Sequence, residues 1–207
     1  MRVTSIEVLK KGIFTVLLDA STTLTLAKEI ALATDLKVGS ELTPEEVLEL
    51  NSADRRYRAH EAALRYLSYR PRSEKEVKDR LRRAGFKKEI VEPELEKLKE
   101  LSLINDTAFA TSWKDGREAS RPRSRRMMGM ELRRKGIPGD VVARVVSSVD
   151  EESGAYTAAA KKARTMGEVG EKDFIQRLGT FLQRRGYGYE LSRRIVLRLW
   201  EERAESR

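Results

Sequence analysis

The sequence has no cysteine and a single histidine, His60, among its 207 residues. The missing cysteines exclude disulfides, thiolate zinc sites and a cysteine nucleophile. His60 has no second metal ligand three or four positions away on its predicted helix, so we interpret it as a surface or packing residue. We therefore predict a protein with no metal site, no cofactor and no catalytic residue, and not an enzyme.

Phosphate-binding loops are also absent. No Gly-x-x-x-x-Gly-Lys-Ser/Thr segment occurs, and no Gly-x-Gly-x-x-Gly follows a predicted strand, so ATP and dinucleotide sites have no support. Most carboxylates alternate with basic residues, as in residues 94–100. This pattern is typical of a solvated helix face, not of an acid-base pair. The purified protein is expected neither to hydrolyse ATP nor to cut DNA.

Long hydrophobic runs are missing as well. No apolar run approaches the roughly 18 residues of a transmembrane helix, and charges interrupt the first twelve residues. We therefore expect a cytoplasmic protein that is neither exported nor membrane-spanning. Aromatic residues make up only 6% of the chain and charged residues 36%, which favours several small helical cores over one broad core.

The charge is strongly positive and unevenly distributed. The net charge is +9, yet residues 1–53 contain 5 Lys or Arg against 8 Asp or Glu. The basic character therefore belongs to residues 54–207. Such a balance indicates an acidic partner, with a plain solvated basic exterior as the alternative.

The first 53 residues predict a small strand-rich domain. Apolar residues alternate at period two from Ile6 to Leu26, interrupted by turn-like segments at 10–12 and 19–21, which is typical of an antiparallel meander. Thr43, Pro44 and Glu46 form a helix start, so we expect a short helix over residues 44–50.

The rest of the chain repeats itself. RPRS stands at 70–73 and 121–124, and LRRAGF at 81–86 is echoed by LRRKGI at 132–137 and LQRRGY at 182–187. The glycines of these motifs are 51 and 50 residues apart, and stop and start signals divide each copy into three helices. The predicted fold is mainly α: three tandem three-helix repeats in an elongated, curved array, over residues 54–104, 105–153 and 154–207.

Two departures from this regularity are apparent. Pro93 falls within the third helix of the first repeat, where it must sit in the first turn or mark a kink. The third repeat has GEVGEK at 167–172 in place of RPRS.

Arginines recur at one place in each repeat. Residues 114–135 contain nine Lys or Arg against three acids, clustered at a proline turn and helix start, where the helix dipole disfavours cations. An external anion would explain them, and reversing the four arginines of 121–126 should then hardly change stability. The predicted contact residues for a partner or nucleic acid are Arg70, Arg72, Arg80, Arg82, Arg83, Arg121, Arg123, Arg125, Arg126, Arg133, Arg134, Arg184, Arg185, Arg193 and Arg194. The alternative is that they are simply solvated.

Several of these motifs, in this order, resemble the RecX family. The matching segments are ALRYLSYRPRSEKEVKDRLRRAGF at 63–86, LKELSLINDTAFATSW at 98–113 and RPRSRRMMGMELRRKGI at 121–137. The resemblance covers about residues 55–200, and the leading domain resembles the strand-rich N-terminal region of longer members. Ser102 departs from the pattern, since the family usually has a glycine there.

The resemblance implies a monomeric regulator of recombination, DNA repair and the SOS response. It would bind the RecA nucleoprotein filament in its helical groove and lower RecA ATPase and strand-exchange activity, with single- and double-stranded DNA as further candidate partners, bound without sequence specificity. The family has no catalytic residues to carry over. A helix-turn-helix DNA-binding regulator is the main alternative from the residues, because short helices joined by glycine turns look similar in sequence. A scaffold that touches no nucleic acid or filament is the third.

Overall fold

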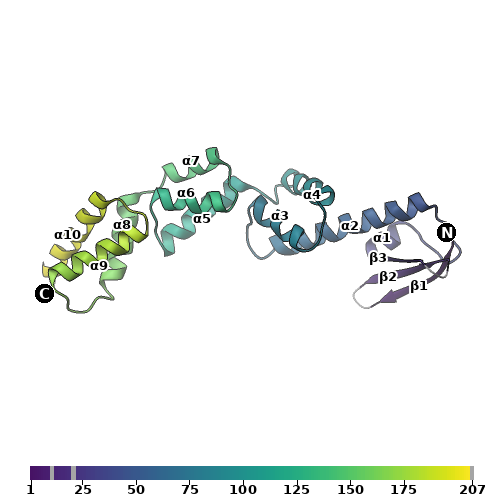
Figure 1. Cartoon of the computed structure of the whole chain (residues 1–207), viewed down its shortest axis with the longest axis horizontal. Helices are drawn as coiled ribbons and strands as arrows, with labels where there is room; N and C mark the ends of the chain where they lie inside the picture. Colours follow the sequence, from purple (N-terminus) through teal and green to yellow (C-terminus); the bar gives the residue numbers. More distant parts are fainter. Residues whose placement is uncertain (10–11, 20–21, 206–207) are drawn as a thin grey trace. The chain divides into compact units, whose positions relative to one another are not determined.

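The computed structural model describes residues 1–207 except 10–11, 20–21 and 206–207. The turns expected at 10–12 and 19–21 thus lie partly outside the described residues. Two compact units are present (Figure 1). The first contains residues 1–71 and 76–104, and the second contains residues 72–75 and 105–207.

The first unit begins with the expected antiparallel meander. Strands β1 (Val3–Leu9), β2 (Ile13–Leu18) and β3 (Thr22–Ala27) pair in the order β1-β2-β3, and helix α1 (Lys28–Ala33) follows. Val16, Leu18, Leu24 and Leu26 are buried on one face, as the period-two alternation predicts. Sequence periodicity therefore identified the core-facing side of β2 and β3. It did not do so in β1, where Val8 of the alternating set is exposed and Val3 is buried instead.

Helix α2 (Pro44–Leu67) is much longer than the predicted helix over 44–50. Its start is as expected, with the Thr43 and Glu46 capping box and Pro44 at the first helical position. Its predicted end is wrong, because no proline or glycine interrupts residues 45–67 and the backbone can continue. The helix runs through the domain limit that we propose after residue 53.

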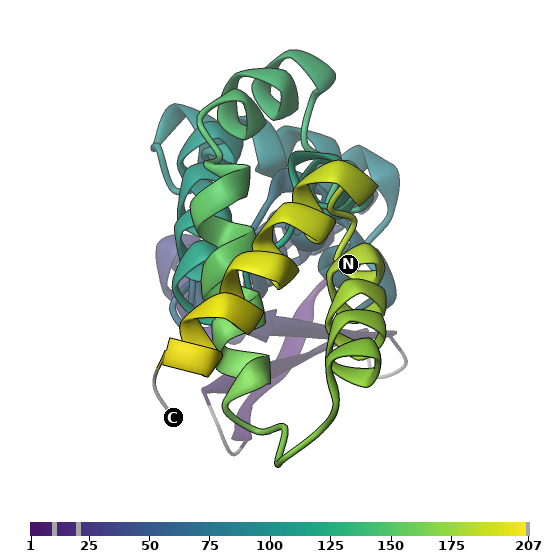
Figure 2. The same ribbon diagram turned by 90° about the vertical axis from the view of Figure 1, so that its left-hand side faces the viewer.

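Three successive three-helix repeats make up the rest of the chain, as predicted, and the structure is mainly α. Each repeat buries apolar residues at equivalent positions; Val77, Met128 and Leu178 are one such set. In the third repeat, the last helix packs against both others (Figure 2). The helices are α2, α3 (Glu74–Arg83) and α4 (Lys88–Glu100); α5 (Asp106–Ser120), α6 (Arg125–Arg134) and α7 (Gly139–Ser147); and α8 (Glu151–Ala163), α9 (Glu171–Arg184) and α10 (Tyr189–Glu205). Pro93 lies inside α4, past its first turn.

The second helix of each repeat ends in the same way. Gly85, Gly136 and Gly186 have φ values of 90°, 84° and 89°, which side chains rarely adopt. The amide after each glycine donates to the carbonyl five residues earlier, for example Tyr187 to Leu182 at 3.2 Å. These two features define a Schellman ending, so each repeated glycine terminates the second helix of its repeat.

Two of these glycines also lie in close contact with the first turn of the second helix of the preceding repeat. A Cβ at Gly186 would lie 2.3 Å from Cγ of Met127, and one at Gly136 would lie 2.5 Å from Cβ of Lys75. At Gly85 nothing lies within 4 Å of the same position. Only Gly136 and Gly186 are therefore required by packing as well as by backbone conformation.

A serine next to each of these two glycine endings donates a hydrogen bond to a carbonyl of that ending, from its hydroxyl in one case and from its backbone amide in the other. Oγ of buried Ser73 donates to the Lys135 carbonyl at 2.7 Å, and the amide of buried Ser124 donates to the Arg185 carbonyl at 3.2 Å. Each serine is the last residue of an RPRS motif. We call this contact the serine joint.

An acid completes each serine joint. The carboxylate of Asp106, at the start of α5, accepts the Glu74 amide at 2.9 Å, and that of Glu151, at the start of α8, accepts the Arg125 amide at 2.8 Å. These amides belong to the first turns of α3 and α6, which have no partner within their own helix. The RPRS motif is thus first of all a packing device.

Ser102, the residue after the C-cap of α4, has a φ of 56°, in the left-handed region. This conformation costs a residue with a side chain about 1–2 kcal/mol, and glycine avoids that cost. Glycine is also more flexible in the unfolded chain, which offsets part of the gain. Ser102→Gly is therefore expected to raise the free energy of unfolding by about 0.5–1 kcal/mol, measured by urea denaturation. Ser68→Gly is the control, because Ser68 has an ordinary helical φ of −63°. Stabilisation by both changes would contradict the explanation.

Candidate nucleic-acid and partner interface

The arginines around the second RPRS motif divide into bound and free side chains. Nε of Arg123 lies 2.9 Å from a Glu131 carboxylate oxygen, and Nε of Arg125 donates to the Val149 carbonyl at 2.9 Å, just beyond the end of α7. Within residues 105–205, Arg121 and Arg126 form no side-chain hydrogen bond or ion pair, and both are exposed. Sequence reasoning assigned all four to an external anion, whereas two have partners inside the repeat.

Glu131 is the centre of a polar cluster in the second repeat. Its carboxylate also accepts hydrogen bonds from Nε of Arg117 at 2.8 Å and Nε1 of Trp113 at 3.0 Å. The Arg117 guanidinium and the Lys135 ammonium lie 4.9 Å and 4.7 Å from the Trp113 ring centroid. Reversing Arg123 would place a second carboxylate beside Glu131. Of the four arginines in residues 121–126, we therefore expect only Arg121 and Arg126 to be reversible to glutamate with little change in stability.

Several arginines of the other repeats are also tied to the protein. The Arg70 guanidinium forms two hydrogen bonds of 3.2 Å with Glu76, and Arg72 is half-buried and has an interaction within the chain. Nη2 of Arg82 lies 3.6 Å from Glu92, Arg83 donates to its own helix, Arg185 donates to the Pro122 carbonyl, and Arg194 pairs with Glu152.

The remaining predicted contact residues form an exposed, unpaired set. Each has an exposed side chain without an ion pair or hydrogen bond to any residue that the structure describes. Arg134 and Arg184 occupy the same position in successive repeats, one residue before the helix cap, where Arg83 stands in the first repeat. Cations suit a helix C-terminus, so these positions also have a local reason for arginine. The unpaired set is Arg80, Arg121, Arg126, Arg133, Arg134, Arg184 and Arg193.

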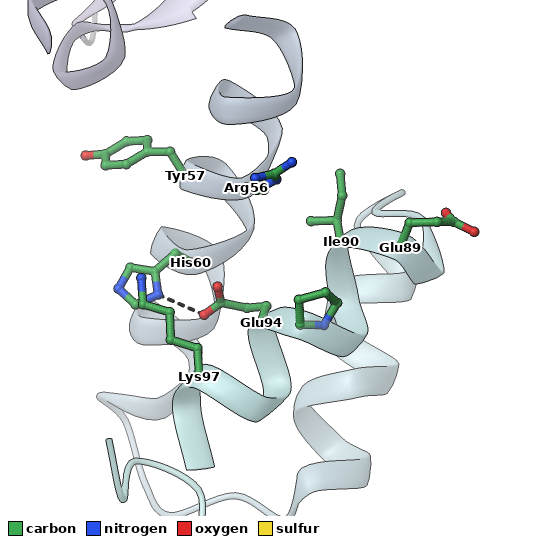
Figure 3. Close-up of a pocket in the computed structure, with 8 residues that line it drawn as sticks. Arg56, Tyr57, His60, Glu89, Ile90, Glu94 and Lys97 are labelled. Carbon is green, nitrogen blue, oxygen red and sulfur yellow. Dashed lines mark hydrogen bonds and ion pairs between the residues drawn. The ribbon is translucent and has the colours of Figure 1, made fainter. Parts of the chain in front are cut away.

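A separate pocket of about 480 Å³ lies between α2 and α4 in the first unit (Figure 3). His60 and Glu94 meet there, with Nδ1 of His60 2.8 Å from a Glu94 carboxylate oxygen. Glu94 is only 7% exposed, and the repeat spacing makes it equivalent to the buried Val145 and Ile195. Sequence reasoning took His60 for a surface or packing residue and missed its acid. The signal was available as a charged residue at a core position of the repeat.

Removal of the imidazole should leave the buried Glu94 carboxylate without its partner. His60→Ala is therefore expected to lower the free energy of unfolding by about 2–3 kcal/mol. Glu94→Val, which introduces the residue of the second repeat, should be neutral or stabilising, and should abolish most of the effect of His60→Ala in the double variant. Urea denaturation followed by circular dichroism measures all three. Additive losses in the double variant would show that the pair is not coupled.

The described residues contain no group of three His, Cys, Asp or Glu side chains arranged to hold a metal ion. None of the helices within the described ranges combines the length and the apolar character needed to cross a membrane.

Comparison with known proteins gives the same division into repeats. The models of the first, second and third three-helix domains of RecX match residues 59–98, 105–146 and 150–196. These matches follow one another in chain order and correspond to the three repeats seen in the structure.

Whole proteins and solved structures agree with these domain matches. A regulatory protein RecX of Amycolatopsis mediterranei is 36% identical over 72% of this chain and 86% of its own length. That of Clostridium perfringens is 30% identical over 96% of both chains. A crystal structure of a regulatory protein RecX covers 94% of this chain and 98% of its own, with a TM-score of 0.67 and 25% identity. Because three RecX domain models match its three repeats in order and whole RecX proteins match most of its length, the chain belongs to the RecX family of regulatory proteins.

Proposed function

We propose that this chain regulates homologous recombination and DNA repair by binding the RecA nucleoprotein filament as a monomer in the cytoplasm. Binding lowers the ATPase and strand-exchange activity of RecA. The observation that carries the proposal is the unpaired arginine set, which lies on repeats matched one by one to RecX domains. An exposed arginine without an internal partner is available for a phosphate or an acidic side chain.

The bound arginines give the unpaired ones a rigid support. Arg123 and Arg125 hold the α6 start against Glu131 and the Val149 carbonyl, while Arg121 and Arg126 on the same turn remain free. Such an arrangement fixes the backbone from which the free guanidinium groups extend, so less conformational entropy is lost on binding. It favours contact with a charged surface and supplies no nucleophile or acid-base pair.

The test is a pull-down on RecA filaments assembled on single-stranded DNA, with bare DNA and free RecA as controls, together with the ATPase rate of RecA. We expect binding to filaments that falls as salt rises, and ATP turnover by RecA that slows as the protein is added. The protein alone should not hydrolyse ATP.

Two results would contradict the proposal. Binding to one palindromic duplex as a two-fold dimer, without RecA, would favour a helix-turn-helix regulator. Binding to neither filaments nor DNA at any salt concentration would indicate a scaffold.

A further inference from the structure

A second pocket, of about 310 Å³, lies within the second unit where the second and third repeats meet. The end of α5, the second RPRS turn, α8 and α9 form its walls. Half-buried Phe181, with the buried Pro122 and Ala158 beside it, provides an apolar wall, and Lys161, Lys162 and Arg185 provide three cations. We call it the joint pocket, because it adjoins the serine joint of Ser124.

The charge of the joint pocket is of one sign. None of its lining residues is an acid. Lys161 and Lys162 are exposed, and their side chains have no polar partner within residues 105–205. Burial, followed by the neighbouring Arg123 and Arg121, lowers the pKa of Arg185. Positive charges held together without a counter-ion favour the binding of an anion.

Arg185 is held in place from two sides. Nη1 donates to the Pro122 carbonyl at 3.0 Å, and the guanidinium lies 4.5 Å from the Phe181 ring centroid. These contacts fix the guanidinium plane and leave its other N–H groups without an acceptor among the residues that the structure describes. A fixed guanidinium plane both donates hydrogen bonds to phosphate and offers a face on which a base stacks.

We propose that the joint pocket binds one nucleotide of a single-stranded nucleic acid, with the phosphate on Lys161, Lys162 and Arg185 and the base against the apolar wall. A carboxylate side chain or free phosphate would engage the cations but leave that wall uncovered. A base inside a duplex is paired and stacked, so it cannot enter without being extruded. The inference deepens the proposed function. It rests on that function only for the identity of the single strand, which would come from the RecA filament.

The experiment measures binding of a fluorescein-labelled oligothymidylate to the full chain by fluorescence anisotropy at several salt concentrations. Lys161→Ala with Lys162→Ala is expected to weaken binding about tenfold and to reduce the slope of log affinity against log salt by about 1.4, or ~0.7 for each lysine that no longer meets a phosphate. The matched control, Lys172→Ala with Arg177→Ala, removes the same charge from exposed residues of the same repeat outside the pocket. It should stay within about twofold of the wild type.

A third variant separates the base from the phosphate. Ala119 is exposed and lines the joint pocket, so Ala119→Phe should fill the space without removing charge. We expect about tenfold weaker binding with an unchanged salt slope, as for the removal of one stacked base. Melting curves of all variants should match that of the wild type.

Four outcomes would overturn the inference. They are no binding of the oligonucleotide by the wild type, equal weakening by the two double variants, unchanged binding by Ala119→Phe, and equal affinity for a polyglutamate peptide that competes for the pocket. The last would indicate an acidic protein segment as the ligand. A double lysine variant that loses the oligonucleotide but still binds RecA filaments supports the inference. A wild type that binds the oligonucleotide through this pocket but not filaments would disprove the proposed function alone.

Discussion

Replacement of Arg121, Arg126, Arg133 and Arg134 by glutamate is expected to weaken binding to RecA filaments at least about 100-fold, because each charge-assisted hydrogen bond to the filament contributes roughly 1 kcal/mol or more. All four are exposed and have no polar partner among the described residues. Replacement at Arg121 and Arg126 should therefore change the free energy of unfolding by no more than about 0.5 kcal/mol per site. Arg133 and Arg134 lie in the last turn of α6, so glutamate there should cost about 1 kcal/mol per site through the helix dipole. The salt dependence of filament binding should flatten at the same time.

A matched variant controls for net charge. Arg144, Arg164, Lys172 and Arg177 are exposed residues of the same unit that the sequence did not predict to bind a partner. Their reversal to glutamate produces the same change of charge, yet should weaken binding far less, because only general electrostatic attraction is removed. Equal weakening by the two variants would show that the unpaired set acts only through its net charge, like any other basic surface residues. Unchanged affinity for the first variant would move the contact surface elsewhere.

Gly186→Ala is expected to lower the free energy of unfolding by about 3 kcal/mol, the sum of backbone strain and a steric clash. The new Cβ would lie 2.3 Å from Cγ of Met127 and 2.5 Å from Oγ of Ser124, so the serine joint must shift. Gly85→Ala has the same strain without a neighbour within 4 Å, and should cost only about 1–2 kcal/mol.

Two spectroscopic signals distinguish the two variants. Circular dichroism follows the helices of both units, whereas both tryptophans, Trp113 and Trp200, lie in the second unit. Fluorescence during urea denaturation should therefore detect Gly186→Ala and not Gly85→Ala. Equal losses of stability at the two glycines would show that the serine joint can shift to accommodate the new Cβ without a further loss of free energy.

The sequence was sufficient for features that depend on local periodicity. The meander, the α2 start, the glycine endings and the buried positions of each repeat follow from spacing and capping residues, and all are confirmed. The end of α2 was not predictable in this way, because Asn51 and Ser52 resemble a boundary but do not break a helix.

The partners of individual arginines depend on tertiary contacts that spacing does not reveal. Arg123 and Arg126 look alike in the sequence. Of these two, only Arg123 pairs with Glu131, further along α6. A serine before a helix is a common cap, and Ser124 caps α6 by accepting a hydrogen bond from the Met127 amide. Its second role, the contact with the cap residue Arg185 of the next repeat, requires residues 61 positions apart.

The serine joint also bears on how such a chain can lengthen by tandem duplication. Each RPRS motif contacts the glycine ending of the following copy. An inserted copy therefore brings a glycine ending for the copy before it and an RPRS motif for the copy after it. The third repeat has GEVGEK where the motif would stand, and α9 starts from Gly170 without a serine cap. A further copy attached after it would meet no matching surface, so growth of the array is limited by a short motif and not by the helices themselves.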